Sequence, residues 1–283
     1  MLSFEFKSAL EFSIPSLADL LTRGFEGYFV PIQINDVALL TMVRRDSVDI
    51  SASRVLLVDG KPAGVALIAR RGWASRLAAM SITRDARSQG AGTWMMDQLV
   101  EEARLREDRA MELEVIEQNE PGVRLYRKSG FEVMRRLVGF SLANPQAAFG
   151  EALQEISLRE AGQAVTRHGL PDLPWQISGE SLAHQTPPAR AFCLGPAYAA
   201  ISNPEMKDIA LHSLVVEEQA RGKGHALRLL SALFANYPEK SWRVPAHCPE
   251  EVGGFFEKAG FQKEKLSQFQ MARSLRAEST ASP

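Results

Sequence analysis

Residues 82–99 read ITRDARSQGAGTWMMDQL, which joins the end of a strand-like segment to a glycine-rich turn and an amphipathic helix. Met95 and Leu99 are one helical turn apart, on the face that we expect to be buried. The first N–H groups of a helix lack intrahelical partners, and glycines allow an anion to approach them closely. Residues 87–92 therefore predict a phosphate-binding turn, to which Arg87 adds a positive charge.

A second copy of this pattern occurs at residues 216–230, VEEQARGKGHALRLL. Arg221, Gly224 and Ala226 repeat the spacing of the first turn, 134 positions further along the chain (221 minus 87). A repeat of this kind indicates two copies of one structural unit. The chain has 283 residues, which is an ordinary length for two domains.

The boundary between the copies is expected at residues 144–148, which contain Pro145 and show no apolar periodicity. We therefore expect an N-terminal domain over residues 1–143 and a C-terminal domain over residues 144–275. The polar stretch at residues 276–283 is expected to be disordered.

Composition argues against several classes of partner. The formal net charge is -1, with both signs mixed along the chain, so we expect neither nucleic acid nor an anionic membrane surface as the main partner. Cys193 and Cys248 are the only cysteines and lack metal-ligand spacing, which predicts reduced thiols and no metal site. No run of eighteen apolar residues and no signal-length apolar N-terminus occur, which is typical of a cytoplasmic protein.

The motifs resemble a known superfamily. RSQGAG at residues 87–92 and RGKGHA at residues 221–226 both fit RxxGx[GA], the pyrophosphate-binding signature of the GNAT acyltransferases. NEPGVRLYRKSGF at residues 119–131 resembles the family element Nxx[AG]xxLYxxxGF, whereas PEEVGGFFEKAGF at residues 249–261 keeps the Gly-Phe ending but lacks the Asn and the Tyr. The chain is identified as a tandem GNAT protein whose second copy is degenerate.

This resemblance implies an α/β (α+β) fold of two tandem GNAT units. Each has a mixed, mostly antiparallel sheet that is splayed at the acyl-CoA site and flanked by helices. It also implies an N-acetyltransferase in which the first copy transfers the acetyl group of acetyl-CoA to a primary amine of a small molecule or peptide, by direct attack in a ternary complex. The alternative is a non-catalytic CoA-binding sensor or interaction module built from two degenerate copies. The oligomeric state stays open, although two fused copies could pack as an internal pseudo-dimer.

Acyl transfer from a thioester to an amine requires a neutral amine, stabilisation of the carbonyl oxygen and a proton for the leaving thiolate. Tyr126 matches the family's tyrosine beside the thioester sulfur, and a phenol is protonated at neutral pH. Glu114 is the candidate base, as in the similar ribosomal-protein N-terminal acetyltransferases. Glu112 shares the same strand face and Glu117 lies at the strand's end, so both remain alternatives.

Contacts with acetyl-CoA are also implied by the resemblance. They come from the end of the strand before the turn, from the turn, and from the downstream Asn and Tyr: Met80, Ser81, Ile82, Arg87, Ser88, Gln89, Gly90, Ala91, Gly92, Thr93, Asn119 and Tyr126. In relatives the segment at residues 24–34 often forms a wall of the acceptor site, so its aromatic residues Phe25, Tyr28 and Phe29 either touch the acceptor or pack under the sheet.

The second copy offers a second candidate cofactor site made of the corresponding turn: Arg221, Gly222, Lys223, Gly224, His225 and Ala226. Phe256 stands in the place of Tyr126 and cannot donate a proton. His212, on the strand before the turn, is a candidate base there. We expect this copy to be structural or to shape the acceptor site rather than to catalyse.

Overall fold

The computed structural model describes residues 2–145 and 150–276, and the chain divides into two compact units. Unit 1 comprises residues 1–134 and 269–283, and unit 2 comprises residues 135–268. The sequence places the boundary after residue 143 instead, and it assigns the end of the chain to the second copy. Positions 146–148 of the expected boundary and positions 277–283 of the expected tail lie outside the described residues.

Among the described residues of unit 1 there are four α-helices, and all except the third begin at a polar side-chain cap. They are α1 (Ile14–Gly24), α2 (Asp36–Asp46), α3 (Ala91–Leu105) and α4 (Glu120–Lys128), with short 3-10 helices η1 (Ala9–Glu11) and η2 (Arg84–Ala86). Ser13 Oγ accepts from the N–H of Ser16 at 3.3 Å, and Asn35 Oδ1 accepts from the N–H of Ala38 at 2.9 Å. The caps of α1 and α2 are therefore Ser13 and Asn35.

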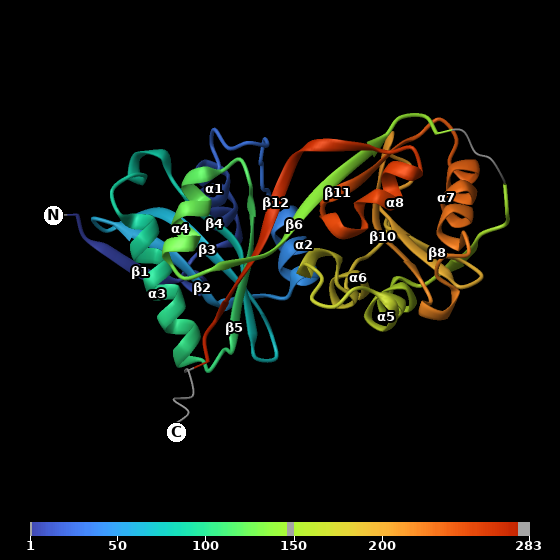
Figure 1. Cartoon of the computed structure of the whole chain (residues 1–283). Coiled ribbons are helices and arrows are strands. Elements are labelled where there is room, and N and C mark those ends of the chain that lie inside the picture. The colour runs from blue at the N-terminus through green and yellow to red at the C-terminus, as the bar shows by residue number, and fades with distance from the viewer. Residues whose placement is uncertain (1, 146–149, 277–283) are drawn as a thin grey trace, which may run out of the picture. The chain divides into compact units, whose positions relative to one another are not determined.

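The sheet of unit 1 has the order β1-β2-β3-β4-β5-β12. Its strands are β1 (Phe4–Ser8), β2 (Val48–Val58), β3 (Lys61–Arg71), β4 (Ala74–Ile82), β5 (Ala110–Ile116) and the part of β12 (Gln262–Ser274) that begins at Phe269. In Figure 1, β12 is the red strand beside β5. The last strand of the chain thus completes the sheet of the first unit.

The strands β1 to β4 pair antiparallel, whereas β4 and β5 pair parallel over only three positions. This short ladder joins Ala74–Arg76 to Ala110–Glu112. Beyond Arg76 the two strands diverge, so β4 keeps a free edge that faces the opening. The sheet of unit 1 is therefore splayed, as expected for a GNAT fold.

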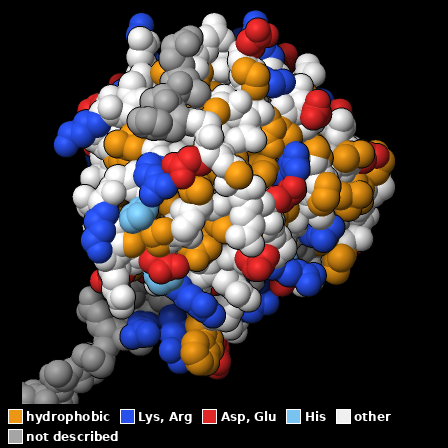
Figure 2. Space-filling model, turned by 90° about the vertical axis from the view of Figure 1, so that its right-hand side faces the viewer, with side chains coloured by type: hydrophobic (Ala, Val, Ile, Leu, Met, Phe, Trp, Pro, Cys, Tyr) orange, Lys and Arg blue, Asp and Glu red, His pale blue; other side chains and the backbone are white. Residues whose placement is uncertain are grey.

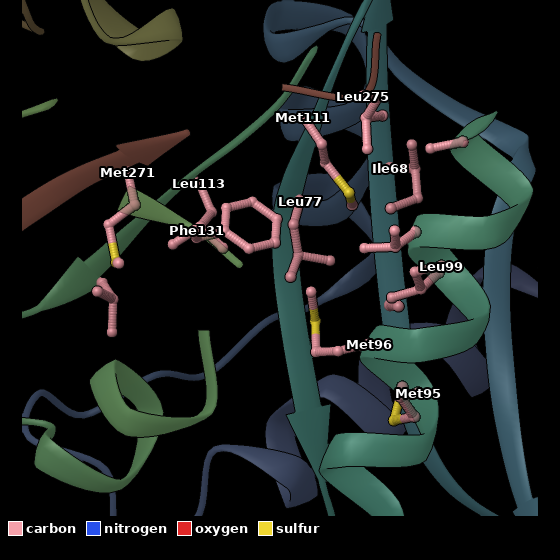
Figure 3. Close-up of a cluster of buried hydrophobic side chains, with 14 of the residues drawn as sticks. Ile68, Leu77, Met95, Met96, Leu99, Met111, Leu113, Phe131, Met271 and Leu275 are labelled. Atoms are coloured by element: carbon pink, nitrogen blue, oxygen red, sulfur yellow. The ribbon is translucent and has the colours of Figure 1, made fainter. Parts of the chain in front are cut away.

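The core of unit 1 lies between α3 and the sheet. Figure 3 shows Met96 and Leu99 pointing from α3 toward Leu77 and Ile68 of the strands. Met95, Met96 and Leu99 are almost completely buried, which agrees with the predicted apolar helix face.

Unit 2 repeats this architecture. Its helices are α5 (Leu158–His168), α6 (Gly179–Ala183), α7 (His225–Asn236) and α8 (Gly253–Lys258), with η3 (Trp175–Ile177), η4 (Glu218–Ala220) and η5 (Glu250–Val252). The strands are β6 (Glu132–Leu142), β7 (Gln154–Ile156), β8 (Arg190–Leu194), β9 (Ala197–Ile201), β10 (Asp208–Val216) and β11 (Ser241–Pro249), in the order β12-β6-β11-β10-β9-β8-β7. The divergence recurs, because β10 and β11 pair parallel only over Asp208–Ala210 and Ser241–Arg243.

The sequence predicts one helix over residues 152–168, and this prediction is wrong at its start. Residues Gln154–Ile156 form β7, which pairs with β8, and α5 begins only after Ser157. Ser157 Oγ accepts from the N–H of Glu160 at 3.1 Å while the Glu160 carboxylate accepts from the N–H of Ser157 at 2.8 Å. This capping box starts the helix at a fixed residue and leaves the preceding segment extended.

Candidate functional site

The predicted phosphate turn of unit 1 connects β4 to α3 through residues 83–90. Gly90 has φ 86° and Ser88 has φ 62°, and Gly90 provides no side-chain cap for the helix. The first N–H groups of α3 therefore have no capping side chain and can receive an anion. Ser88, Gln89 and Gly90 are exposed, whereas Ala91 is buried.

Gly92 lets α3 and α4 approach each other. A Cβ at this position would lie 3.3 Å from Leu125 Cδ2 and 3.7 Å from Ile82 Cδ1. Because Leu125 precedes Tyr126 in α4, this contact places the helix that carries the tyrosine against the first turn of α3. The structure thus brings together the predicted turn and the predicted proton donor.

Arg87 donates hydrogen bonds to backbone carbonyls in the structure. Its Nε donates to Ile82 O at 2.9 Å, and its Nη2 donates to Gly24 O at 2.8 Å and to Glu26 O at 3.2 Å. The guanidinium therefore fixes the segment after α1 against the turn. The contact of Arg87 with phosphate oxygens stays a prediction.

The end of β4 carries the predicted pantetheine contacts. Met80, Ser81 and Ile82 pair with Ala66, Val65 and Gly64 of β3, so their other edge faces the opening between β4 and β5. The helix α1 packs closely here, since a Cβ on Gly24 would lie 2.3 Å from Ser81 Oγ.

Asn119 and Tyr126 lie at the two ends of the predicted Asn-Tyr element. Asn119 Oδ1 accepts from the N–H of Gly122 at 3.2 Å, so Asn119 is the N-cap of α4. Tyr126 is half-buried, with its ring centroid 6.2 Å from that of Phe131. Burial raises the pKa of the Tyr126 phenol, and interaction with Tyr28 raises it further, so this group is protonated at neutral pH.

Tyr28 is a site residue whose partners the sequence did not reveal. Its side chain is hydrogen-bonded to that of Asn119, and it interacts electrostatically with Tyr126. Burial raises the pKa of Tyr28, and the hydrogen bond with Asn119 opposes this rise. The rings of Phe25 and Phe29 lie 5.3 and 5.4 Å from that of Tyr28 and hold it in place. The segment after α1 therefore contacts two of the predicted site residues, Asn119 and Tyr126.

Glu114, the predicted base, forms a buried ion pair. Arg76 Nε and Nη2 both donate to Glu114 Oε2, at 2.8 and 2.6 Å, and the two side chains are only 5% and 2% exposed. The sequence analysis missed Arg76 because the pairing of β4 with β5 cannot be read from either strand alone. The alternative bases Glu112 and Glu117 are half-buried, and Glu112 lies opposite Arg76 in the ladder.

The second predicted turn has the same backbone conformation as the first. Gly222 and Gly224 have φ 75° and 81°, and Gly224 provides no side-chain cap for α7. Arg221 Nε donates to Val216 O at 3.4 Å and its Nη2 donates to His168 O, whereas Lys223 Nζ donates to Gln219 O at 3.1 Å.

Charged groups are mixed on the surface that Figure 2 shows, where Lys and Arg side chains lie among Asp, Glu and hydrophobic ones. Within residues 2–145 and 150–276, no helix has the length and apolar character needed to cross a membrane. The same described residues contain no group of three or more His, Cys, Asp or Glu side chains arranged to hold a metal ion.

Residues 16–131 match the model of the acetyltransferase (GNAT) family. No curated protein sequence matches the chain. Three similar solved structures are a tandem GNAT protein from the clavulanic acid biosynthesis pathway and GCN5-related N-acetyltransferases from Sphaerobacter thermophilus and Anabaena variabilis.

The tandem GNAT protein is 15% identical, with a TM-score of 0.66, over 98% of this chain and 100% of that chain. The Sphaerobacter thermophilus protein is 13% identical, with a TM-score of 0.66, over 98% of this chain and 96% of that chain. The Anabaena variabilis protein is 16% identical, with a TM-score of 0.65, over 97% of this chain and 73% of that chain. Residues 16–131 therefore resemble the acetyltransferase (GNAT) family, and the chain as a whole has the fold of a tandem GNAT protein.

Proposed function

We propose that unit 1 is an N-acetyltransferase that transfers the acetyl group of acetyl-CoA to a primary amine of a small molecule or peptide. The observation that carries this proposal is the contact of α3 with α4 at Gly92 and Leu125, which joins an uncapped anion-binding turn to the helix of Tyr126. The resemblance of residues 16–131 to the GNAT family supports acyl-CoA as the donor.

The diphosphate of acetyl-CoA would bind the N–H groups of the turn at Ser88–Thr93, with Arg87 adding positive charge at its edge. The pantetheine arm would lie along the free edge of β4 at Met80–Ile82, in the manner of an added strand. These groups position the thioester in the opening between β4 and β5.

Transfer begins when the neutral amine nitrogen attacks the carbonyl carbon of the thioester. The carbon–sulfur bond then breaks. The nitrogen gives up one proton as it becomes an amide, which restores the proton of the acid, and the leaving thiolate takes a proton. Tyr126 supplies this proton or a strong hydrogen bond, because its raised pKa keeps the phenol protonated. Tyr28 and Asn119 hold the acceptor side of the site by their mutual hydrogen bond.

The amine proton must leave before attack. Glu114 remains the proposed base, but the proton would reach it through water rather than directly from the amine. The reason is that Arg76 donates to Oε2 of Glu114 and that both side chains are buried. Its ion pair also joins β4 to β5 at the point where the strands diverge.

The test is CoA release from acetyl-CoA in the presence of a panel of primary amines. Tyr126→Phe should lower kcat by roughly 10- to 100-fold while acetyl-CoA affinity is kept, which is the usual effect of losing one acid. The matched control is Tyr237→Phe, which changes a tyrosine of unit 2 and should leave kcat unchanged. Unchanged turnover in Tyr126→Phe would remove this residue from the mechanism. Acetyl-CoA binding without acetylation of any amine would favour a non-catalytic sensor.

A further inference from the structure

Arg87 joins two elements of unit 1 that are far apart in the chain. Its Nε donates to the carbonyl of Ile82, the last residue of β4, and its Nη2 donates to the carbonyl of Gly24, the last residue of α1. The carbonyls in the last turn of a helix lack intrahelical donors, and a cation is favourable there. We refer to this pair of hydrogen bonds as the arginine bridge. It caps α1 from the turn that leads to α3.

Unit 2 has the same arginine bridge. Arg221 Nε donates to the carbonyl of Val216 at 3.4 Å, and Arg221 Nη2 donates to the carbonyl of His168. Val216 is the last residue of β10 and His168 is the last residue of α5, so the two arginines connect corresponding points. The bridge occurs although Phe256 stands in the place of the tyrosine in unit 2. It is therefore a feature of the turn itself.

In unit 1 the bridge also reaches the segment after α1. Arg87 Nη2 donates to the carbonyl of Glu26 at 3.2 Å. This carbonyl lies inside a tight turn, because the N–H of Tyr28 donates to the carbonyl of Phe25 at 3.0 Å. Gly27 has φ 72°, as the third position of a type II turn requires. Arg87 thus holds the middle of the turn that ends at Tyr28.

Tyr28 connects this turn to the site. Its side chain is hydrogen-bonded to that of Asn119 and interacts electrostatically with Tyr126. The ring centroid of Phe25 lies 5.3 Å from that of Tyr28, so the two ends of the turn pack against each other. A movement of the Glu26 peptide would therefore displace the Tyr28 phenol relative to Asn119.

Most donors of Arg87 are used by these contacts. A guanidinium has five N–H groups. Three of them donate to carbonyls here, one from Nε and two from Nη2. A bidentate contact of a guanidinium with phosphate uses Nη2 together with Nε or Nη1, so it would compete with the bridge. The N–H groups of residues 88–93 can bind the diphosphate without breaking any of these hydrogen bonds.

We infer that Arg87 is a positioning residue for the amine rather than a direct ligand of the diphosphate. It holds the turn after α1 in the conformation that places Tyr28 beside Asn119. This inference rests on the proposed acetyl transfer by unit 1, in which Tyr28 and Asn119 lie on the acceptor side. Loss of the bridge should therefore weaken amine binding and spare acetyl-CoA binding.

The experiment compares Arg87→Gln with Arg87→Lys in the full chain. Glutamine removes the charge, whereas lysine keeps the charge, and neither reproduces the planar arrangement of donors. With the best amine of the panel, both variants should raise the KM for the amine by roughly fivefold, which corresponds to the loss of one hydrogen bond. The value of kcat should change little, because Tyr126 is unaltered.

The Kd for acetyl-CoA separates the two roles of Arg87. Calorimetry should show a Kd that rises by less than about fivefold in Arg87→Gln, because an exposed charge contributes little through solvent. A direct hydrogen bond to phosphate would instead cost roughly tenfold or more. A loss of that size in Arg87→Gln that Arg87→Lys restores, with an unchanged KM for the amine, would overturn the inference.

The matched control is Arg54→Lys. Arg54 Nη1 also donates to two backbone carbonyls, those of Ser51 at 2.7 Å and Ser53 at 3.0 Å, and its Nε donates to Glu102 at 2.9 Å. These partners lie in β2 and α3 rather than in the segment after α1. Arg54→Lys should leave the KM for the amine unchanged. An equal rise in KM would show a general effect of lost hydrogen bonds and would contradict the inference.

A double variant tests whether Arg87 acts through Tyr28. Tyr28→Phe alone should raise the KM for the amine by roughly fivefold. If the two residues act as one unit, Arg87→Lys combined with Tyr28→Phe should raise KM by roughly fivefold as well, and not by roughly 25-fold. A rise of roughly 25-fold would mean that the two residues act independently, against the inference.

Hydrogen exchange measures the bridge without any acceptor. In Arg87→Lys the amides of residues 25–29 should exchange faster than in the unaltered chain, whereas the amides of α3 should keep their protection. Unchanged exchange at residues 25–29 would show that Arg87 does not hold this turn. Failure of the unaltered chain to acetylate any amine would contradict the proposed function instead, so the two proposals fail in different measurements.

Discussion

Replacing Glu114 with leucine should destabilise unit 1 by leaving Arg76 buried without its anionic partner. The Arg76 side chain is 5% exposed and donates twice to Glu114 Oε2, at 2.8 and 2.6 Å. Removing one partner of a buried ion pair costs about 3–5 kcal/mol, because the remaining charge stays desolvated. Glu114→Leu is therefore expected to lose that amount of unfolding free energy in unit 1.

The matched control is the double variant Arg76→Met, Glu114→Leu, which removes both charges and keeps similar side-chain volume. Apolar replacement of a buried ion pair is often neutral or stabilising, so the double variant should recover most of the loss. Urea denaturation gives the unfolding free energy, and hydrogen exchange of β4 and β5 locates the change in unit 1.

Two outcomes would refute this reasoning. If the Glu114→Leu variant were as stable as the unaltered chain, the ion pair would contribute nothing to the unfolding free energy. A double variant as unstable as Glu114→Leu would show that Glu114 stabilises unit 1 through contacts other than the one with Arg76.

Three further predictions follow from the site. An acid acts only while it is protonated, and burial raises the pKa of the Tyr126 phenol above its ordinary value. Ionisation of this phenol should therefore not lower kcat between pH 7 and about 9.5. A fall of kcat in that range that disappears in Tyr126→Phe would contradict this. Tyr28→Phe removes the hydrogen bond with Asn119. Steady-state kinetics should show a KM for the amine that is raised by roughly fivefold, which corresponds to the loss of one hydrogen bond. Calorimetry should show little change in acetyl-CoA affinity. Gly24→Ala forces a Cβ to within 2.3 Å of Ser81 Oγ and should cost about 1–3 kcal/mol in a denaturation experiment, whereas Gly254→Ala, where a Cβ meets no atom within 4 Å, should not destabilise the protein.

Local features of the fold could be predicted from the sequence. The turn before α3 and the buried face with Met95 and Leu99 depend on residues that are close in the chain, so spacing alone indicates them. The repeat predicted a second splayed sheet, and the ladders of β4 with β5 and of β10 with β11 confirm it.

Features that depend on long-range pairing could not be predicted. The end of β12 lies beside β5 in unit 1, and Leu275 N donates to Arg109 O at 2.9 Å, although more than a hundred residues separate these strands. No local pattern specifies which sheet such a strand joins. The ion pair of Arg76 with Glu114 has the same origin, because it depends on the register of two strands.

The candidate site was predictable where a motif specifies it and not where a loop completes it. Asn119, Tyr126 and the turn follow from family motifs, whereas the hydrogen bond of Tyr28 with Asn119 depends on how the segment after α1 folds back. The acceptor-side aromatic residues were expected either to touch substrate or to pack under the sheet. The structure shows that Tyr28 makes a polar contact with a predicted site residue.

The most direct test of acetyl transfer by unit 1 is the rate at which acetylated amine forms in the full chain carrying Gly90→Asp, compared with Gly224→Asp. Both glycines have φ near 80°, and a Cβ on either meets no atom within 4 Å, so the two changes impose similar strain in different units. Transfer that is lost with Gly90→Asp and far less affected by Gly224→Asp is the predicted result. The reverse pattern would place the catalytic site in unit 2 and contradict the account.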